Sequence, residues 1–262
     1  MRMHWTYHGD PDQPVLLLLH GFLGCGGDMA HVRRELADRH GCLVCNLPGH
    51  GEHVAGYAPA DYTAEATAEA LIGILDELEI ARAHMLGYSL GGRVALYTAL
   101  AHPGRCGRLV LESASAGLAV PALRRERREL DLRRAAELRA GGVEAFLRTW
   151  YDQPLFANLR ERPELLRQLK RRLRSGDAEG LALSLESIGA GSYPSLWERL
   201  PELRMPVLLV CGARDAKFVA LNREMAERLP DARLVVVPGV GHNVHLEEPR
   251  RFARIVGEFL AA

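Results

Sequence analysis

One short segment places a serine between small residues at a position where chemistry is common. Gly87-Tyr88-Ser89-Leu90-Gly91 fits the pattern Gly-x-Ser-x-Gly, and it lies between the apolar run 84–86 and a stretch with helical spacing, 92–101. A tight strand-to-helix turn projects the serine hydroxyl, and the glycines let neighbouring backbone approach. The start of a helix also favours negative charge that develops there. The segment therefore predicts a nucleophile elbow with Ser89 as the reacting residue.

The remaining members of a catalytic triad can be sought downstream. A serine hydroxyl is a poor nucleophile and a poor base, so it needs a histidine, and the histidine needs a carboxylate that fixes its tautomer. After a nucleophile elbow these partners come in the order Asp, His, each just beyond a later strand. Asp215 follows the apolar run 207–211, and His242 follows the run 233–237. We predict the triad Ser89, Asp215 and His242, with His245 as a rival to His242.

Negative charge that develops on a substrate oxygen calls for backbone amides aimed at it. One donor should be the amide of Leu90, directly after the serine, and the other should lie in the loop after an early strand. That loop is His20-Gly21-Phe22-Leu23-Gly24, so Phe22 is the predicted second donor, and His20 is expected to order the loop. No His, Cys, Asp or Glu cluster has the spacing of metal ligands, so we expect neither a metal nor another cofactor.

The elements that must position these residues alternate along the chain. Mostly continuous apolar runs are typical of strands in a parallel sheet that is covered on both faces, and they occur at 15–19, 42–47, 83–86, 108–111, 207–211 and 233–237. Apolar residues at three- and four-residue spacing predict helices at 61–78, 90–101, 222–229 and 249–260. This alternation predicts an α/β fold with a mostly parallel, doubly wound central sheet and helices on both faces.

One region interrupts the alternation. From about 118 to 200 the pattern is helical with no strand candidate, so we predict a helical cap over 118–200, inserted into a core formed by 1–117 and 201–262. Within 118–174 there are fifteen Lys and Arg against eight Asp and Glu. Most of these arginines are expected to lie on helix faces that are exposed to solvent. A few that point inward would suffice for an anion-binding site.

Composition excludes several classes of protein. The chain has 262 residues, 48% of them hydrophobic and 25% charged, which is typical of a soluble globular protein. Its 33 basic and 33 acidic residues give no overall field for nucleic acid or an anionic membrane. No apolar run approaches the roughly 18 to 20 residues that cross a bilayer, and no secretory signal is recognisable. Five irregularly spaced cysteines favour reduced thiols and a cytoplasmic location, while the oligomeric state is left open.

Longer segments resemble a known family. The resemblance is to the α/β-hydrolase superfamily and, more narrowly, to the menaquinone-pathway synthases of 2-succinyl-6-hydroxy-2,4-cyclohexadiene-1-carboxylate. It covers essentially the whole chain, with the helical insertion as the cap, although Met29 stands where the family often has an aromatic residue. The Trp-Tyr…Pro-x-Phe and Asp-x-Lys-Phe pieces are more specific than Gly-x-Ser-x-Gly. The matching segments are Gly87-Tyr88-Ser89-Leu90-Gly91-Gly92-Arg93, Trp150-Tyr151-Asp152-Gln153-Pro154-Leu155-Phe156, Asp215-Ala216-Lys217-Phe218 and Gly241-His242-Asn243-Val244-His245.

The resemblance implies a substrate and residues that bind it. The family expels pyruvate from 2-succinyl-5-enolpyruvyl-6-hydroxy-3-cyclohexene-1-carboxylate without a cofactor. This small polycarboxylate needs arginine forks to offset its desolvation in a covered cleft. Arg93, Arg127 and Arg171 match the carboxylate-binding arginines of the family. Tyr88 and Trp150 match aromatic walls of the site.

The resemblance also implies a mechanism in which no acyl-enzyme forms. Ser89, polarised by His242 and oriented by Asp215, would act as the base that removes a ring proton α to the succinyl carbonyl. The amides of Phe22 and Leu90 would stabilise the enolate-like oxygen.

Two other functions stay open at this point. The same triad would serve a hydrolase of carboxylic esters or carbon–carbon bonds. The scaffold could also carry a binding module without catalysis, such as a small-molecule receptor, although an intact triad argues against it. The arginines and the segment from Trp150 to Phe156 favour the lyase.

Overall fold

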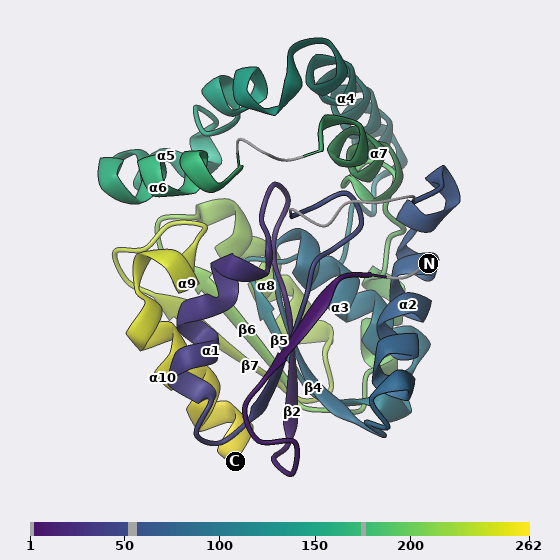
Figure 1. Cartoon of the computed structure of the whole chain (residues 1–262), viewed down its shortest axis with the longest axis vertical. Helices are drawn as coiled ribbons and strands as arrows, with labels where there is room; N and C mark the ends of the chain where they lie inside the picture. Colours follow the sequence, from purple (N-terminus) through teal and green to yellow (C-terminus); the bar gives the residue numbers. More distant parts are fainter. Residues whose placement is uncertain (1–2, 52–56, 174–176) are drawn as a thin grey trace.

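The computed structural model describes residues 3–51, 57–173 and 177–262. Its centre is a seven-stranded sheet in the order β1-β3-β2-β4-β5-β6-β7, with helices on both faces (Figure 1). The first strand runs antiparallel to β3, and the other neighbours pair in parallel. The predicted α/β fold with a mostly parallel sheet is confirmed. The strands are β1 Trp5–His8, β2 Val15–Leu19, β3 Gly41–Cys45, β4 Ala83–Tyr88, β5 Cys106–Glu112, β6 Val207–Gly212 and β7 Ala232–Val237.

Helices of the core cover the sheet in two layers. On one face, Val32 of α1 and Phe252 of α10 pack into a cluster with apolar residues of the strands. On the other face, Leu71 of α2, Val94 of α3 and Met225 of α8 belong to a second and larger cluster. The sheet is therefore buried on both sides, which explains why its strands are almost continuously apolar. These helices are α1 Ala30–Leu36, α2 Ala64–Glu77, α3 Leu90–Ala101, α8 Ala216–Arg228 and α10 Pro249–Ala261.

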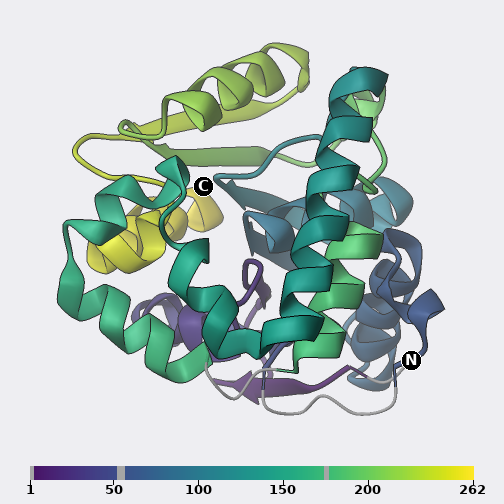
Figure 2. The same cartoon turned by 90° about the horizontal axis from the view of Figure 1, so that it is seen from above.

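A layer of helices lies over the carboxyl ends of the strands (Figures 1 and 2). In the chain order these helices come after β5 and before β6. The sequence predicts a helical insertion over 118–200, and the described residues between β5 and β6 form helices and include no further strand. The longest helix, α4, bends at Gly142, whose φ of 71° lies in the left-handed region. The layer has its own apolar cluster, in which α4 packs against α7. Its helices are α4 Pro121–Trp150, α5 Ala157–Arg160, α6 Pro163–Leu173 and α7 Ala178–Ile188.

The chain shows no sign of a membrane span or a disulfide framework where it is described. No helix among these residues is long and apolar enough to cross a bilayer. None of the five cysteines forms a disulfide within the described residues, and Cys42 and Cys45 are buried in β3. Burial raises the pKa of Cys45 to about 12, so this thiol stays protonated and unreactive at neutral pH.

Two histidines in the loops beyond β2 and β3 are buried and neutral. His20 Nε2 accepts a hydrogen bond from the Leu47 amide at 3.0 Å. His20 Nδ1 lies 2.8 Å from the carbonyl oxygen of Gly21. Nδ1 of His50 lies 2.9 Å from the carbonyl oxygen of Pro48. Desolvation lowers the pKa of His20 to about 4 and that of His50 to about 3.

We expect these two groups to make the fold sensitive to acid. Below the ordinary histidine pKa of about 6.5 the unfolded chain binds protons that the folded chain excludes, so the free energy of unfolding falls as pH falls, until pH reaches the folded-state values. Each histidine contributes about 1.4 kcal/mol per pH unit well inside that window. Urea unfolding between pH 7 and pH 5 measures the slope. His50→Gln should flatten it, and an unchanged slope in this variant would show that His50 does not contribute.

Candidate active site

The serine lies on a strained turn between β4 and α3. Ser89 has φ 51° and ψ −104°, a conformation that residues with side chains rarely adopt. The turn also requires close backbone packing on both sides. A Cβ added to Gly91 would lie 2.4 Å from the carbonyl oxygen of His20, and one added to Gly87 would lie 2.3 Å from that of Gly91. A larger residue would therefore clash with the backbone at either glycine of the motif. The turn leaves the Ser89 side chain half-buried in a cavity.

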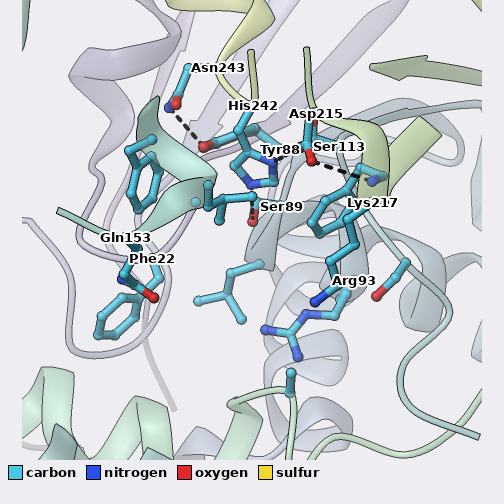
Figure 3. A pocket seen from close by; sticks show the side chains of 18 of the residues that line it. Phe22, Tyr88, Ser89, Arg93, Ser113, Gln153, Asp215, Lys217, His242 and Asn243 are labelled. Carbon is cyan, nitrogen blue, oxygen red and sulfur yellow. Dashed lines mark hydrogen bonds and ion pairs between the residues drawn. The ribbon is translucent and has the colours of Figure 1, made fainter. Parts of the chain in front are cut away.

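The three predicted triad residues meet in space (Figure 3). His242 Nε2 lies 3.2 Å from Ser89 Oγ, and His242 Nδ1 lies 2.6 Å from Asp215 Oδ2. The side chains of His242 and Asp215 are almost fully buried. A carboxylate beside Nδ1 places the proton on that nitrogen, which leaves Nε2 free to accept the serine proton. The arrangement can therefore activate Ser89 either as a nucleophile or as a base.

Asp215 has a second role at the start of a helix. It is the N-cap of α8, and its Oδ1 accepts the amide of Phe218 at 3.4 Å. Because one carboxylate serves both His242 and the helix, the direction of its oxygens is fixed from two sides. The loop from β6 to α8 thus holds the acid in place.

The rival histidine belongs to a different buried pair. His245 Nδ1 lies 2.9 Å from Glu112 Oε1, and the backbone amide of His245 donates to the same oxygen at 2.9 Å. The backbone carbonyl of Glu112 accepts the amide of Ser89, also at 2.9 Å. Glu112 therefore connects the serine turn with the loop that carries His242. No sequence motif singled out Glu112, although an acid at the end of the apolar run 108–111 was a usable signal.

Replacing Glu112 with alanine should destabilise the fold. The change leaves two donors of His245 buried without an acceptor, and such losses cost about 1–3 kcal/mol each. We expect the free energy of unfolding to fall by roughly 3 kcal/mol, measured by urea denaturation at pH 7. Glu202→Ala, in the exposed pair with Arg199, is the control and should change little. Equal effects of the two substitutions would contradict a special role for Glu112.

The two proposed oxyanion donors lie at the same cavity. Leu90 is the first residue of α3, and the first amides of a helix have no acceptor within that helix. Phe22 lies in the loop after β2, where its ring contacts Trp150 with centroids 5.0 Å apart. Both residues line the cavity, together with Ser89. That the amides of Phe22 and Leu90 donate to a substrate oxygen stays a prediction.

The cavity has a volume of about 1050 Å³ and lies between the strand ends and the helical layer. Four of the five predicted substrate-binding residues line it, namely Tyr88, Arg93, Arg127 and Trp150. The Tyr88 hydroxyl accepts a hydrogen bond from Asn243 Nδ2 at 2.7 Å. Burial, followed by the charge of Glu112, raises the pKa of Tyr88, so its phenol stays neutral.

Arg171 is the exception among the predicted residues. Its side chain is exposed on α6, and it is absent from the lining of the cavity. The same helix presents Leu169 to the cavity, and residues two apart on a helix point in nearly opposite directions. In this structure Arg171 therefore does not line the cavity with Arg93 and Arg127.

A different arginine of the helical layer faces the cavity. The guanidinium carbon of Arg134 lies 5.0 Å from the ring centroid of Trp150, and Nη2 donates to Gln153 Oε1 at 2.5 Å. Arg134 was not among the residues predicted from the sequence. Arg134 follows Arg127 by seven residues, which is two helical turns and hence the same face of α4, so spacing could have indicated it.

Two of these arginines differ in their electrostatic partners. Arg127 Nε donates to buried Asp131 at 2.8 Å, so its charge is balanced. Arg93 has no carboxylate within ion-pair distance in the described ranges, and its Nη1 is buried without a hydrogen-bond partner. Desolvation lowers the pKa of Arg93 to about 10, which still leaves it charged at neutral pH. No group of three or more potential metal ligands occurs among the described residues.

Comparison with known proteins places the chain in a family. The alpha/beta hydrolase fold family matches residues 14–249. A protein of Bacillus subtilis (strain 168) named putative 2-succinyl-6-hydroxy-2,4-cyclohexadiene-1-carboxylate synthase is 39% identical over 252 residues, which is 95% of this chain and 90% of that protein. The chain belongs to the α/β-hydrolase fold family, among these synthases.

Two solved structures are similar to the chain over nearly its whole length. MenH from S. aureus has a TM-score of 0.93 and 32% sequence identity, and the match covers 98% of both chains. The enol-lactonase from Burkholderia xenovorans LB400 has a TM-score of 0.87 and 27% identity over 99% of this chain and 96% of that one. The synthase family therefore has relatives of similar shape with other chemistry.

Proposed function

We propose that the chain is a cofactor-independent lyase that eliminates pyruvate from 2-succinyl-5-enolpyruvyl-6-hydroxy-3-cyclohexene-1-carboxylate. The product is 2-succinyl-6-hydroxy-2,4-cyclohexadiene-1-carboxylate, an intermediate of menaquinone biosynthesis. The observation that carries this proposal is the opening of the Ser89–His242–Asp215 arrangement into a cavity lined by several arginines. The synthase relatives support it. Cysteines that form no disulfide within the described residues suit a cytoplasmic enzyme.

The basic lining matches the charge of this substrate. The substrate has carboxylates on the ring, on the succinyl chain and on the enolpyruvyl group. Arg93 enters from α3, while Arg127 and Arg134 enter from α4, so guanidinium groups reach the cavity from both the core and the helical layer. Charge-assisted hydrogen bonds from these planar groups offset the desolvation of carboxylates. Arg134 lines the cavity, whereas Arg171 does not.

In the proposed reaction Ser89 acts as a base. Its hydroxyl proton moves to His242 Nε2, and Ser89 Oγ takes the proton at ring carbon 2, α to the succinyl carbonyl. The electrons of that C–H bond form the double bond between carbons 2 and 3. The former double bond shifts to carbons 4 and 5, and the bond from carbon 5 to oxygen breaks. Pyruvate leaves as its enolate and takes up the proton from His242.

Two features of the cavity support this elimination. The amides of Phe22 and Leu90 are the proposed donors to the succinyl carbonyl oxygen, which gains negative charge as the ring proton leaves. The aromatic side chains of Phe22, Trp150 and Phe156 form an apolar wall that limits water at the reacting carbon. Less water also strengthens the ionic contacts of the substrate.

A hydrolase of carboxylic esters or carbon–carbon bonds is the second candidate. The triad geometry would serve a covalent acyl-enzyme equally well, and the likeness to an enol-lactonase favours this alternative. The cavity arginines argue for the lyase because a simple ester requires no such charges.

A two-arm assay tests the proposal. The precursor is generated in place, and the release of pyruvate and of the cyclohexadiene product is followed, while p-nitrophenyl acetate cleavage is measured in parallel. We expect rapid pyruvate release and negligible ester cleavage. Pyruvate release at the spontaneous rate, with Ser89-dependent ester cleavage, would reject the lyase and support the hydrolase.

A further inference from the structure

Lys217 is a residue of the Asp-x-Lys-Phe segment to which the proposed reaction assigns no role. It lies two residues after Asp215 and lines the cavity. In Figure 3 its side chain extends into the cavity on the side of Arg93, below Ser89. The residue is exposed, so its ammonium group can meet a ligand that enters from solvent.

Helix stability does not explain a lysine at this position. Lys217 is the second residue of α8, and a cation in the first turn of a helix opposes the helix macrodipole. Within the part of the chain that the structure describes, no carboxylate lies within ion-pair distance of it, and its aromatic contact is the Phe218 ring at 6.0 Å. The lysine thus carries a positive charge where the fold alone would favour an acid.

The neighbouring basic residues of the cavity fall into two groups. Arg127 is paired with Asp131, and Arg214 is paired with Glu161 at 2.6 Å. Arg93, Arg134 and Lys217 have no such partner among the described residues. Arg134 donates to Gln153 instead, whereas Arg93 presents a buried Nη1 without an acceptor. The positive charges of Arg93 and Lys217 at one cavity repel each other, and an anion between them removes that cost.

We propose that Lys217 is a substrate-binding residue, and that its ammonium group and the Arg93 guanidinium together bind one carboxylate of the substrate beside Ser89. The proposal rests on the proposed function and deepens it. Arg93 supplies a planar fork held over the Tyr193 ring at 5.0 Å, whereas Lys217 supplies a mobile point charge. The carboxylate can be that of the ring or that of the enolpyruvyl group, and both sit close to the bonds that change.

Steady-state kinetics of pyruvate release test this role. We expect Lys217→Met to raise KM by about 10- to 100-fold with a much smaller change in kcat, because a contact to an ionised group is lost from bound substrate. Lys217→Arg keeps the charge and should recover most of the loss. Lys170→Met is the matched control, because Lys170 is the only other lysine in the chain. An unchanged KM in Lys217→Met would overturn the proposal.

Inhibition by the product distinguishes the two carboxylates. The product keeps the ring carboxylate but has lost the enolpyruvyl group. If Lys217→Met weakens product binding as much as it raises KM, the ring carboxylate is the ligand. If it raises KM alone, the enolpyruvyl carboxylate is the ligand. Either result supports a carboxylate site at Lys217.

A footprint provides a readout without turnover. The chain is acylated with an amine-selective reagent with and without saturating product, and the two lysines are quantified by mass spectrometry. We expect the product to slow acylation of Lys217 and to leave Lys170 unchanged, if the ring carboxylate is the ligand. Equal acylation of Lys217 with and without product, together with an unchanged KM in Lys217→Met, would reject the site. Absence of pyruvate release from the parent enzyme would instead reject the proposed function, so the two failures are separable.

Discussion

Replacing Ser89 with alanine is expected to reduce pyruvate release by about 10³-fold, within the range of 10²–10⁴ that positioned bases contribute. The change removes the Oγ that lies 3.2 Å from His242 Nε2 and leaves no group at that place to take the ring proton. Alanine has no greater bulk than serine, so the turn should retain its shape and the cavity its volume. The measurement is kcat for pyruvate release under saturating substrate, with product binding as a check that the cavity is intact.

Ser113→Ala is the matched control for this substitution. Ser113 lines the same cavity, and its hydroxyl is buried without a hydrogen-bond partner. Its removal should leave kcat within a few-fold of the parent. Near-parental turnover in Ser89→Ala would show that another group is the base, and the triad geometry would then need a different interpretation.

The sequence predicted the core of the fold because its signals are local. The sheet strands are buried on both faces, so each reads as a continuous apolar run, and the predicted strands agree with β2 to β7 within a few residues. The strand β1 and the helix α1 escaped prediction. Trp5–His8 is half-buried at the edge of the sheet, and the seven residues of α1 bury only Val32 and Leu36. Neither element has enough apolar residues to establish a period.

The serine, the acid and the histidine could also be predicted, because each directly follows a strand that carries its own signal. The parallel sheet then brings all three carboxyl ends to one edge. The start of α8 at Ala216 was missed, although Asp215 is a favourable N-cap. Recognition of that cap would have shown that the acid is held from two sides.

Residues of the helical layer could not be assigned from sequence with the same success. The layer contains many arginines, and whether one faces solvent or the cavity depends on how each helix is rotated. Leu169 occupies the inward position on α6, which turns Arg171 outward. Arg134 turns inward because Trp150 and Gln153 offer it a ring and an acceptor. Packing between the helices determines these orientations, and a single sequence does not show how the helices pack.

Replacing Asp215 with asparagine separates the two roles of this residue. Asparagine is as good an N-cap as aspartate, and its oxygen can still accept the Phe218 amide, so the free energy of unfolding should change by no more than about 1 kcal/mol. The NH₂ group of the asparagine would then replace Oδ2, which lies 2.6 Å from His242 Nδ1. Two donors cannot share that contact, so His242 is pushed toward the tautomer with its proton on Nε2.

In that tautomer His242 cannot accept the proton of Ser89, so we expect kcat for pyruvate release to fall by about 10²–10⁴-fold in a folded enzyme. Asp215→Ala should lose both functions and be less stable as well, because the start of α8 then lacks its acceptor. Comparing the two variants by urea denaturation and by kcat assigns each effect to one oxygen of the carboxylate. Full activity in Asp215→Asn would mean that His242 holds its tautomer without the negative charge, and the acid would then serve the helix alone.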